Sequence, residues 1–378
     1  MRILHIIIGL NNGGAEGALF RLAAADHRNT HEVVSMMDAG VFGGRLVDLG
    51  IQVHTLAMPR GRITLHAVRK LLRLVRQAKP DVVQTWMYHA DLVGGIVAKL
   101  AGAMTVVWGI RANDAHLHPA GVSSRTLVWL CARFSWIVPR RIIAVSNSGS
   151  RLHRQIGYCA SKIRVIPNGY DTDALTPDLE RRERIRREWG ITPGVKLIGT
   201  VARWDALKDH ETLVEALSEL NTLTHDAWVC ALIGTGMTEA NRDLTALLDR
   251  YQISGKFRLF GPLDDVCGVM NAFDIHVLSS KSEAFPNVLA EAMACATPCV
   301  ATDVGDVRRI VGATGWVVPP ANPGGIARAL SMAFREMADV TAWERRRILC
   351  RARIIDEFSV RQMVDAYNAV WTEAVRQT

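Results

Sequence analysis

Short apolar segments rich in Val and Ile alternate with helix-like segments along almost the whole chain, and this alternation constrains the fold more than any other feature. The expected strands are residues 3–8, 31–36, 52–55, 82–85, 105–108, 142–145, 164–166, 196–202, 228–233, 257–260, 275–278, 298–301 and 315–318. The expected helices include residues 16–25, 65–77, 91–100, 211–220, 241–249, 288–294 and 326–335. Repeated strand–helix units predict parallel sheets with helices on both faces.

The alternation stops in the middle of the chain, at IPNGYDTDALTPDLERRERIRREWGITPG, residues 166–194. The prolines, the Asn-Gly pair and the charge run of this stretch are typical of a linker. A chain of 378 residues that is 49% hydrophobic is also too long for one ordinary core. We therefore expect an α/β protein with two doubly wound, Rossmann-like parallel-sheet domains. Their ligand would bind beyond the carboxyl ends of the strands, in a cleft where the domains face each other.

Charge is distributed unevenly over the two halves. Residues 1–170 contain 21 Lys and Arg against 8 Asp and Glu, whereas residues 171–378 contain 24 against 29. The net charge of +13 on the first half indicates an anionic partner, which can be nucleic acid, a phosphorylated substrate or an anionic membrane surface. A basic surface without a dedicated partner is the alternative.

The seven cysteines are odd in number and form no CxxC pair, which favours reduced, buried thiols over disulfides or a zinc site. No apolar run reaches the roughly 18 residues of a membrane-spanning helix. The opening MRILHIIIGL is followed by a turn instead of a signal cleavage site, so we expect a buried first strand and a cytoplasmic protein.

Two loops contain residues that suit a phosphate. NNGGAEG follows the first strand and precedes a helix, so Gly13 and Gly14 would let the backbone approach an anion. It lacks the GxGxxG pattern, which disfavours a nicotinamide cofactor. RWDALK places Arg203 and Lys208 at the carboxyl end of a strand, where two cations can neutralise a diphosphate without a metal. A tight turn without a ligand and a pair of surface cations are the plainer interpretations.

The most informative motif is SKSEAFPNVLAEAMACATPCVATDVGD, residues 280–306. Glu283 stands in a turn after a strand, and Glu291 would lie about one turn inside the next helix. The two carboxylates would accept hydrogen bonds from hydroxyl groups on either side of an anion bound by the first helical amides. Hydroxyl, phosphate and hydroxyl outline a sugar–diphosphate–ribose ligand. The residues that start this helix are Phe285, Pro286, Asn287, Val288 and Leu289.

This motif, with two glutamates eight residues apart, closely resembles the donor site of family 4 glycosyltransferases of the GT-B fold. Arg203 with Lys208 is similar to the phosphate pair of that family. GGAE at residues 13–16 resembles its first glycine loop, VIPNGYDTD at residues 165–173 its interdomain hinge, and VGATGWVVPP at residues 311–320 a further segment. The resemblance runs in order through nearly the whole chain. WGIR at residues 108–111 resembles a subgroup linked to bacterial surface polysaccharide synthesis.

The resemblance implies an acceptor-side domain at residues 1–168, a nucleotide-sugar donor domain at residues 169–358, and a last helix within residues 359–378 that packs back on the first domain. It implies retaining transfer from a UDP- or GDP-linked sugar, without cofactor or metal. Glu283 would contact the transferred sugar, Glu291 the ribose, and Arg203 and Lys208 the diphosphate. The other donor-binding residues would be Gly13, Gly14, Glu16, Gly234, Gly236, Pro262, Leu263, Phe285, Pro286, Asn287, Val288 and Leu289.

One departure from the family concerns a catalytic histidine that many members carry in a loop after a late strand of the first domain. Here the segment reads VVWGIRANDAHLH, so Arg111, Asn113 and His116 are the candidates to replace it. The histidines in this segment are otherwise ordinary loop residues. His89 and Asp91, in WMYHADLVGG, resemble a family segment on the acceptor side.

Two segments suggest contact with a membrane. SRTLVWLCARFSWIVPRR at residues 124–141 mixes aromatic residues with arginines, as an interfacial helix does, although it also suits a core. GRITLHAVRKLLRLVRQAKP at residues 61–80 would form a basic helix with an apolar stripe of Leu65, Val68, Leu72 and Val75. With the basic half, these segments favour peripheral association with the inner face of the cytoplasmic membrane. They also favour a lipid-diphosphate-linked saccharide acceptor, as in lipopolysaccharide or exopolysaccharide synthesis.

Other functions compete with this interpretation. A nucleotide-sugar epimerase or hydrolase of the same fold would need no acceptor groove. A nucleic-acid-binding protein would use the basic half, but the chain has no helix-turn-helix, RNA-recognition or zinc signature, so we expect no nucleic acid. A noncatalytic subunit would have lost its site, whereas Arg203, Lys208, Glu283 and Glu291 are all present.

Overall fold

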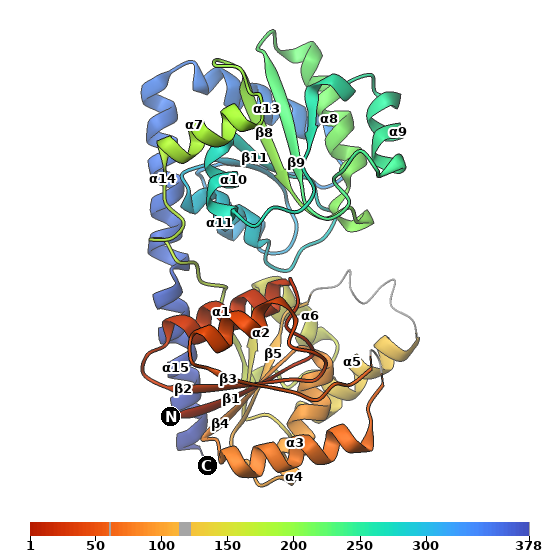
Figure 1. The fold of residues 1–378 in the computed structure, drawn as a ribbon, viewed down its shortest axis with the longest axis vertical. Helices are drawn as coiled ribbons and strands as arrows, with labels where there is room; N and C mark the ends of the chain where they lie inside the picture. The colour runs from red at the N-terminus through yellow and green to blue at the C-terminus, as the bar shows by residue number, and fades with distance from the viewer. Residues whose placement is uncertain (60–61, 113–121, 378) are drawn as a thin grey trace. The chain divides into compact units, whose positions relative to one another are not determined.

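The computed structural model describes residues 1–59, 62–112 and 122–377, and it divides into two compact units (Figure 1). Unit 1 comprises Met1–Gly169 and Val360–Thr378, and unit 2 comprises Tyr170–Ser359. The first boundary between the units thus follows Gly169, one residue after the boundary expected at residue 168. The chain returns to unit 1 at Val360, one residue after the expected start of the last helix segment at residue 359.

The described part of unit 1 contains a seven-stranded sheet in the order β3-β2-β1-β4-β5-β6-β7, in which all neighbours are parallel. Ile3 and Ile7 of β1 pack with α1 and α15, whereas Leu4 and Ile6 pack with α3, α4 and α5 on the other face. The strands are β1 (Arg2–Ile7), β2 (Thr30–Ser35), β3 (Gln52–Thr55), β4 (Val82–Trp86), β5 (Val106–Ile110), β6 (Arg141–Ala144) and β7 (Ile163–Val165). The helices are α1 (Gly14–Ala25), α2 (Gly40–Asp48), α3 (Leu65–Ala78), α4 (Gly95–Leu100), α5 (Val122–Phe134), α6 (Asn147–Gln155) and α15 (Val360–Arg376), with a π-helical segment η1 (Ala90–Gly94).

Unit 2 contains a six-stranded parallel sheet in the order β10-β9-β8-β11-β12-β13. Helices α8, α9 and α13 share one hydrophobic core with Ile198, Leu232 and Val277 of this sheet. The strands are β8 (Lys196–Val201), β9 (Trp228–Ile233), β10 (Phe257–Leu259), β11 (Ile275–Leu278), β12 (Cys299–Thr302) and β13 (Trp316–Val318). The helices are α7 (Leu179–Glu188), α8 (His210–Leu223), α9 (Arg242–Arg250), α10 (Val266–Ala272), α11 (Asn287–Ala294), α12 (Val307–Val311), α13 (Pro323–Met337) and α14 (Val340–Phe358). The expected doubly wound α/β class is confirmed.

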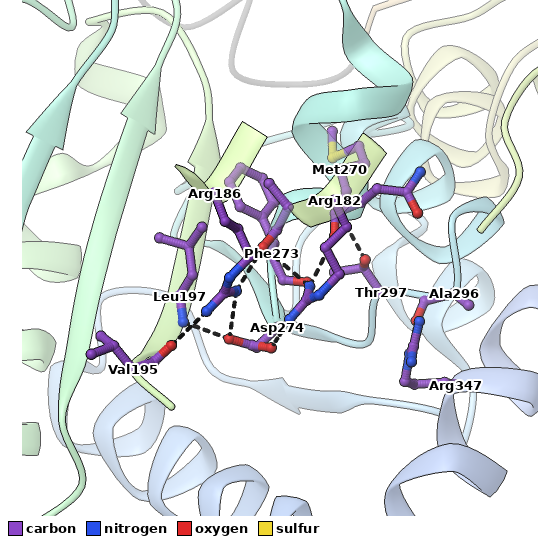
Figure 2. A network of polar contacts seen from close by, with 12 residues as sticks. Arg182, Arg186, Val195, Leu197, Met270, Phe273, Asp274, Ala296, Thr297 and Arg347 are labelled. Carbon is purple, nitrogen blue, oxygen red and sulfur yellow. Dashed lines mark hydrogen bonds and ion pairs between the residues drawn. The ribbon is translucent and has the colours of Figure 1, made fainter. Parts of the chain in front are cut away.

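The charge run in the expected linker forms helix α7 of unit 2, so the prediction of a linker is wrong for residues 179–188. Asp178 caps α7 by accepting a hydrogen bond from the Arg181 amide at 2.8 Å. Arg182 and Arg186 of this helix both bind Asp274, which directly precedes β11 (Figure 2). Because a carboxylate far along the chain holds these arginines, a segment that looks like a solvated linker packs as part of unit 2.

The basic helix α3 also differs in detail from its prediction. Its buried residues are Ala67, Leu71 and Val75, whereas Leu65 is 63% exposed. The expected stripe is therefore wrong at its first residue, because the buried face is rotated by about one position along the helix.

Two expectations about the chain as a whole can be compared with the described residues. All seven cysteines are free and buried, as the sequence indicates. No helix in the described ranges is long and apolar enough to cross a membrane.

Candidate active site

The strand order of unit 2 reverses between β8 and β11, and ligands of parallel α/β sheets bind beyond the carboxyl ends of strands at such a point. Lys208 lies in the loop after β8, and Glu283 lies in the loop after β11. Lys208 Nζ donates to Glu283 Oε1 at 2.5 Å, and Ser280 Oγ donates to the same oxygen at 2.7 Å. The sheet thus brings together two residues that lie 75 positions apart in the sequence.

Arg203 lies on the same loop as Lys208 but points to solvent. Its side chain is 61% exposed, and its Nε donates to Asp205 Oδ2 at 2.9 Å. Asp205 also accepts from the Leu207 amide at 2.9 Å, which fixes the short turn that leads to Lys208. The loop therefore presents one exposed guanidinium and one ammonium held by a carboxylate.

The loop that contains Arg203 packs closely against glycines of the loop after β9, and that loop is hydrogen-bonded to the loop after β10. Gly234 has a φ of +136°, and a Cβ there would lie 2.2 Å from the Ala202 carbonyl oxygen. A Cβ at Gly236 would lie 2.7 Å from the Cβ of Trp204. The Gly234 amide donates to the Gly261 carbonyl at 2.8 Å. Pro262 and Leu263 follow with exposed side chains, so the expected donor-binding residues Gly234, Gly236, Pro262 and Leu263 lie on connected loops.

Helix α11 begins within the segment expected to start it, residues 285–289, with Pro286 as the cap and Asn287 as the first helical residue. Asn287 Oδ1 accepts from the hydroxyl of Tyr170 at 2.6 Å. Val288 and Glu291 are partly exposed, whereas Leu289 is buried and its amide donates to the Pro286 carbonyl at 3.3 Å. Leu289 therefore has a packing role, and its amide is used inside the helix turn. Phe285 is also buried, with its ring 5.7 Å from that of Phe358.

Sequence reasoning assigned no role to Gly305, although it lies within the motif at residues 280–306. Gly305 has a φ of +59°, and a Cβ there would lie 2.1 Å from the Glu283 carbonyl oxygen. The backbone of Glu283 can therefore take its position only against a glycine. The positive φ and the long-range contact are properties of the fold, and only the VGD triplet itself could have drawn attention to this residue.

In unit 1, the glycine loop after β1 leads directly into α1, with Gly13 at the cap. The carboxylate of Glu16 folds back over this loop, so a Cβ at Gly13 would lie 2.3 Å from Glu16 Oε2. Burial raises the pKa of Glu16, and hydrogen bonds from the backbone of Glu16 and Ala15 and the charge of Arg111 lower it in part. Gly14 and Glu16 thus lie in the first turn of α1, and the N-terminus of this helix faces the protein's own carboxylate.

Arg111 follows β5, and three groups hold its guanidinium. Nη1 donates to Asn168 Oδ1 at 2.5 Å, and Nη2 donates to the hydroxyl of Tyr367. The guanidinium carbon lies 4.5 Å from the centre of the Trp86 ring. Asn168, Tyr367 and Trp86 come from three other segments of unit 1, and no local pattern in the sequence identifies them. The other two candidates to replace the family histidine, Asn113 and His116, lie outside the described residues.

His89 and Asp91 flank the start of the π-helical segment η1 but differ in access. His89 is exposed, and the burial of part of its side chain lowers its pKa. Asp91 is fully buried, and its Oδ1 accepts from Thr85 Oγ1 at 2.5 Å and from the Gly109 amide at 3.1 Å. Burial raises the pKa of Asp91 to about 8. Asp91 therefore links β4 to β5 inside the protein, and the expectation that it contacts an acceptor does not agree with this position.

Comparisons with known proteins agree with this architecture. Residues 12–174 match the model described as Glycosyltransferase Family 4, and residues 195–336 match the model described as Glycosyl transferases group 1. D-inositol 3-phosphate glycosyltransferase of Corynebacterium jeikeium is 37% identical over 207 residues, which cover 51% of this chain and 49% of the relative. The putative glycosyltransferase EpsF of Bacillus subtilis is 24% identical over 323 residues, 80% of this chain and 79% of the relative.

The chain spans about half the length of the first curated relatives that it matches. Among solved structures, the Anabaena protein HepE in complex with UDP-glucose superposes with a TM-score of 0.84 at 21% identity, over 100% of both chains. The lipopolysaccharide glycosyltransferase WaaG superposes with a TM-score of 0.70 at 16% identity, over 97% of this chain and 99% of that chain.

Two parallel-sheet α/β units and matches to glycosyltransferase models on both define the class of this protein, a glycosyltransferase of the GT-B fold. Within that class, the chain belongs to glycosyltransferase family 4.

Proposed function

We propose that this glycosyltransferase moves a hexosyl group from a UDP- or GDP-linked sugar with retention of anomeric configuration and without a metal ion. The meeting of Lys208 and Glu283 beyond the ends of β8 and β11 is the observation that carries the proposal. A cation that suits a diphosphate and a carboxylate that suits sugar hydroxyls are in contact at the point where parallel sheets bind ligands. The complex of the structurally similar HepE with UDP-glucose supports the same class of donor.

In this proposal, Arg203 and Lys208 bind the diphosphate, and Glu283 exchanges its bond with Lys208 for hydroxyl groups of the sugar. Glu291 binds the ribose, and the base lies by the connected glycine loops. The acceptor oxygen bonds to the anomeric carbon on the face from which the phosphate departs. The departing phosphate oxygen takes the electron pair of the broken bond and the proton of the acceptor hydroxyl. No protein base is then required, and the two cations supply most of the stabilisation.

The proposed acceptor is a lipid-diphosphate-linked saccharide, used in cell-surface polysaccharide synthesis at the inner face of the cytoplasmic membrane. Unit 1 supports this with exposed apolar side chains near basic ones. Ile63 and Leu65 at the start of α3 are 54% and 63% exposed, and Trp129 of α5 is 60% exposed. Trp136 and Ile137, just after α5, are 61% and 72% exposed. Such residues can enter the headgroup layer while arginines contact anionic lipids.

A thermal-shift screen over UDP, GDP and their common sugars tests the donor assignment. We expect one nucleoside diphosphate and one of its sugars to raise the melting temperature by several degrees, because a ligand that binds only the folded state stabilises it. No shift with any of them would contradict the proposal. Rapid donor turnover without an acceptor would instead favour a hydrolase or epimerase of this fold.

A further inference from the structure

The guanidinium of Arg111 is held by three groups, although this side chain is partly exposed. Its guanidinium lies on the ring of Trp86 and donates to Asn168 and to the hydroxyl of Tyr367. Both Trp86 and Tyr367 are fully buried, and their rings stack with centroids 6.1 Å apart at 14°. The orientation of the guanidinium is therefore set by two buried aromatic rings from β4 and α15.

The support continues beneath Trp86 through a chain of buried polar groups. Trp86 Nε1 can only donate, so His5 Nδ1 accepts from it at 3.2 Å. His5 Nε2 then carries a hydrogen and donates to His31 Nδ1 at 2.9 Å. His31 Nε2 faces Asp26 Oδ2 at 3.4 Å. This assignment of donors fixes the indole in its plane, and with it the ring face on which Arg111 lies.

The electrostatic surroundings of Arg111 point to an anion. Arg111 follows β5, the glycine loop follows β1, and β4 with Trp86 at its end lies between these strands. The carboxylate of Glu16 lies over the glycine loop, close enough to Arg111 that the arginine lowers its pKa. Asp91 is also near, but burial raises its pKa to about 8, so it adds little negative charge at neutral pH. A cation held in a fixed orientation, with the charge of Glu16 acting on it among the described residues, is suited to bind a ligand oxyanion.

We propose that Arg111, fixed by Trp86, Tyr367 and Asn168, binds a phosphate group of the acceptor. Glu16, whose carboxylate lies over the glycine loop, opposes phosphate binding by like-charge repulsion. This inference rests on the proposed function for the existence of an acceptor. The phosphate site itself depends only on residues of unit 1, whereas Arg203 and Lys208 of unit 2 are assigned to the donor.

The test is calorimetric titration of the full chain with inorganic phosphate, in saturating UDP and at constant ionic strength. We expect Arg111→Gln to weaken phosphate binding at least about tenfold, since it removes a charge-assisted contact. Tyr367→Phe should weaken it severalfold because the guanidinium loses one of its supports. Glu16→Gln should strengthen it severalfold, and a role in folding alone would not produce these opposite signs. Arg151→Gln, at an exposed arginine of α6, is the matched control and should change nothing.

Equal phosphate affinity in the wild type and Arg111→Gln would overturn the site. Loss of phosphate binding on addition of UDP would show that the anion belongs to the donor, and would overturn the acceptor assignment. If Arg111→Gln does not fold, Tyr367→Phe and Glu16→Gln decide. If GDP has to replace UDP in this titration, the test is otherwise the same, and only if neither nucleotide binds the wild type does the proposed function fail. The titration without UDP, in a Lys208→Gln background, then still tests the oxyanion site by itself.

Discussion

Lys208 and Glu283 form an ion pair of 2.5 Å between the loops that follow two adjacent strands, and their side chains are only 22% and 13% exposed. Since both charges are partly buried, each depends on the other for compensation. A donor that offers phosphate to Lys208 and hydroxyls to Glu283 would replace this bond with two new ones. The ion pair thus links the two chemical requirements of a nucleotide-sugar site.

Substitution of the two glutamates of the donor motif should affect different quantities, the rate of transfer for Glu283 and the affinity for the nucleotide for Glu291. Glu283→Ala should lower kcat by about 100-fold or more, since it removes contacts proposed to the transferred sugar, and should change nucleotide affinity little. Glu291→Ala should weaken nucleotide binding by about tenfold, the value of a charge-assisted hydrogen bond. Calorimetry with the nucleoside diphosphate and initial rates with its sugar measure the two effects. Wild-type behaviour of both variants would show that the site lies elsewhere.

Gly305→Ala should disturb Glu283 without touching any charge. The added methyl group would clash with the Glu283 carbonyl, and the positive φ disfavours alanine. We expect a loss of stability of about 1–3 kcal/mol, typical of strain at such a position, and a kcat reduced by at least about tenfold. Gly255→Ala is the control, because a Cβ there meets nothing within 4 Å. Equal rates in the two variants would exclude this role for Gly305.

Asp91 should make stability depend on pH. Its native pKa is raised to about 8 by burial, so the native state keeps the proton at pH values where the unfolded chain has lost it. Stability should therefore fall as pH rises from about 4 to 8, by up to about 1.4 kcal/mol per pH unit from this group.

Asp91→Asn should remove this contribution and be more stable than the wild type near pH 8. Urea unfolding at several pH values measures the slope. Asp48→Asn, at an exposed carboxylate of unit 1, should leave the slope unchanged. An unaltered slope in Asp91→Asn would mean that this carboxyl ionises in the native state.

The contacts of α7 should contribute to stability without affecting the site. Arg182 donates to three carbonyl oxygens and to Asp274, which lies just before β11 (Figure 2). Glu283 follows the other end of that strand. Arg182→Gln should cost about 2 kcal/mol, because three carbonyl oxygens and Asp274 lose this donor, although Asp274 keeps Arg186 and the Leu197 amide. Arg184→Gln on the same helix should cost under about 0.5 kcal/mol, since that side chain is exposed. Equal unfolding midpoints would contradict the assignment.

Membrane association should depend on the basic face of α3. Replacing exposed Arg69, Arg73 and Arg76 by Gln should lower sedimentation with anionic vesicles more than tenfold, at about 1 kcal/mol per charge near the surface. The double variant Arg184→Gln, Arg187→Gln in unit 2 controls for a general loss of charge. Unchanged sedimentation of the α3 variant would exclude this face as the contact.

The sequence predicted what depends on near neighbours in the chain. The strands follow from local runs of apolar residues, and Glu283 and Glu291 are placed by a single turn and helix start. The ion pair of Lys208 with Glu283 requires knowing that β8 and β11 are adjacent, which no local pattern states. The support of Arg111 by Trp86 and Tyr367 likewise joins segments more than 200 positions apart.

Predictions from the sequence were wrong for charged residues whose partners lie far away in the chain. Arg182 and Arg186 look solvated until Asp274 is placed beside them, and Asp91 looks accessible until β4 and β5 enclose it. Sequence patterns report the polarity of a side chain, whereas burial depends on which segments pack around it.

The central claim is that unit 2 binds a nucleoside diphosphate through Lys208 and Arg203. Calorimetric titration of UDP and GDP into the wild type, Lys208→Gln and Arg184→Gln tests it most directly. We predict one-to-one binding of one of the two nucleotides, weakened at least about tenfold in Lys208→Gln and unchanged in Arg184→Gln. Binding of equal strength in all three proteins, or no binding of either nucleotide to the wild type, would contradict the account.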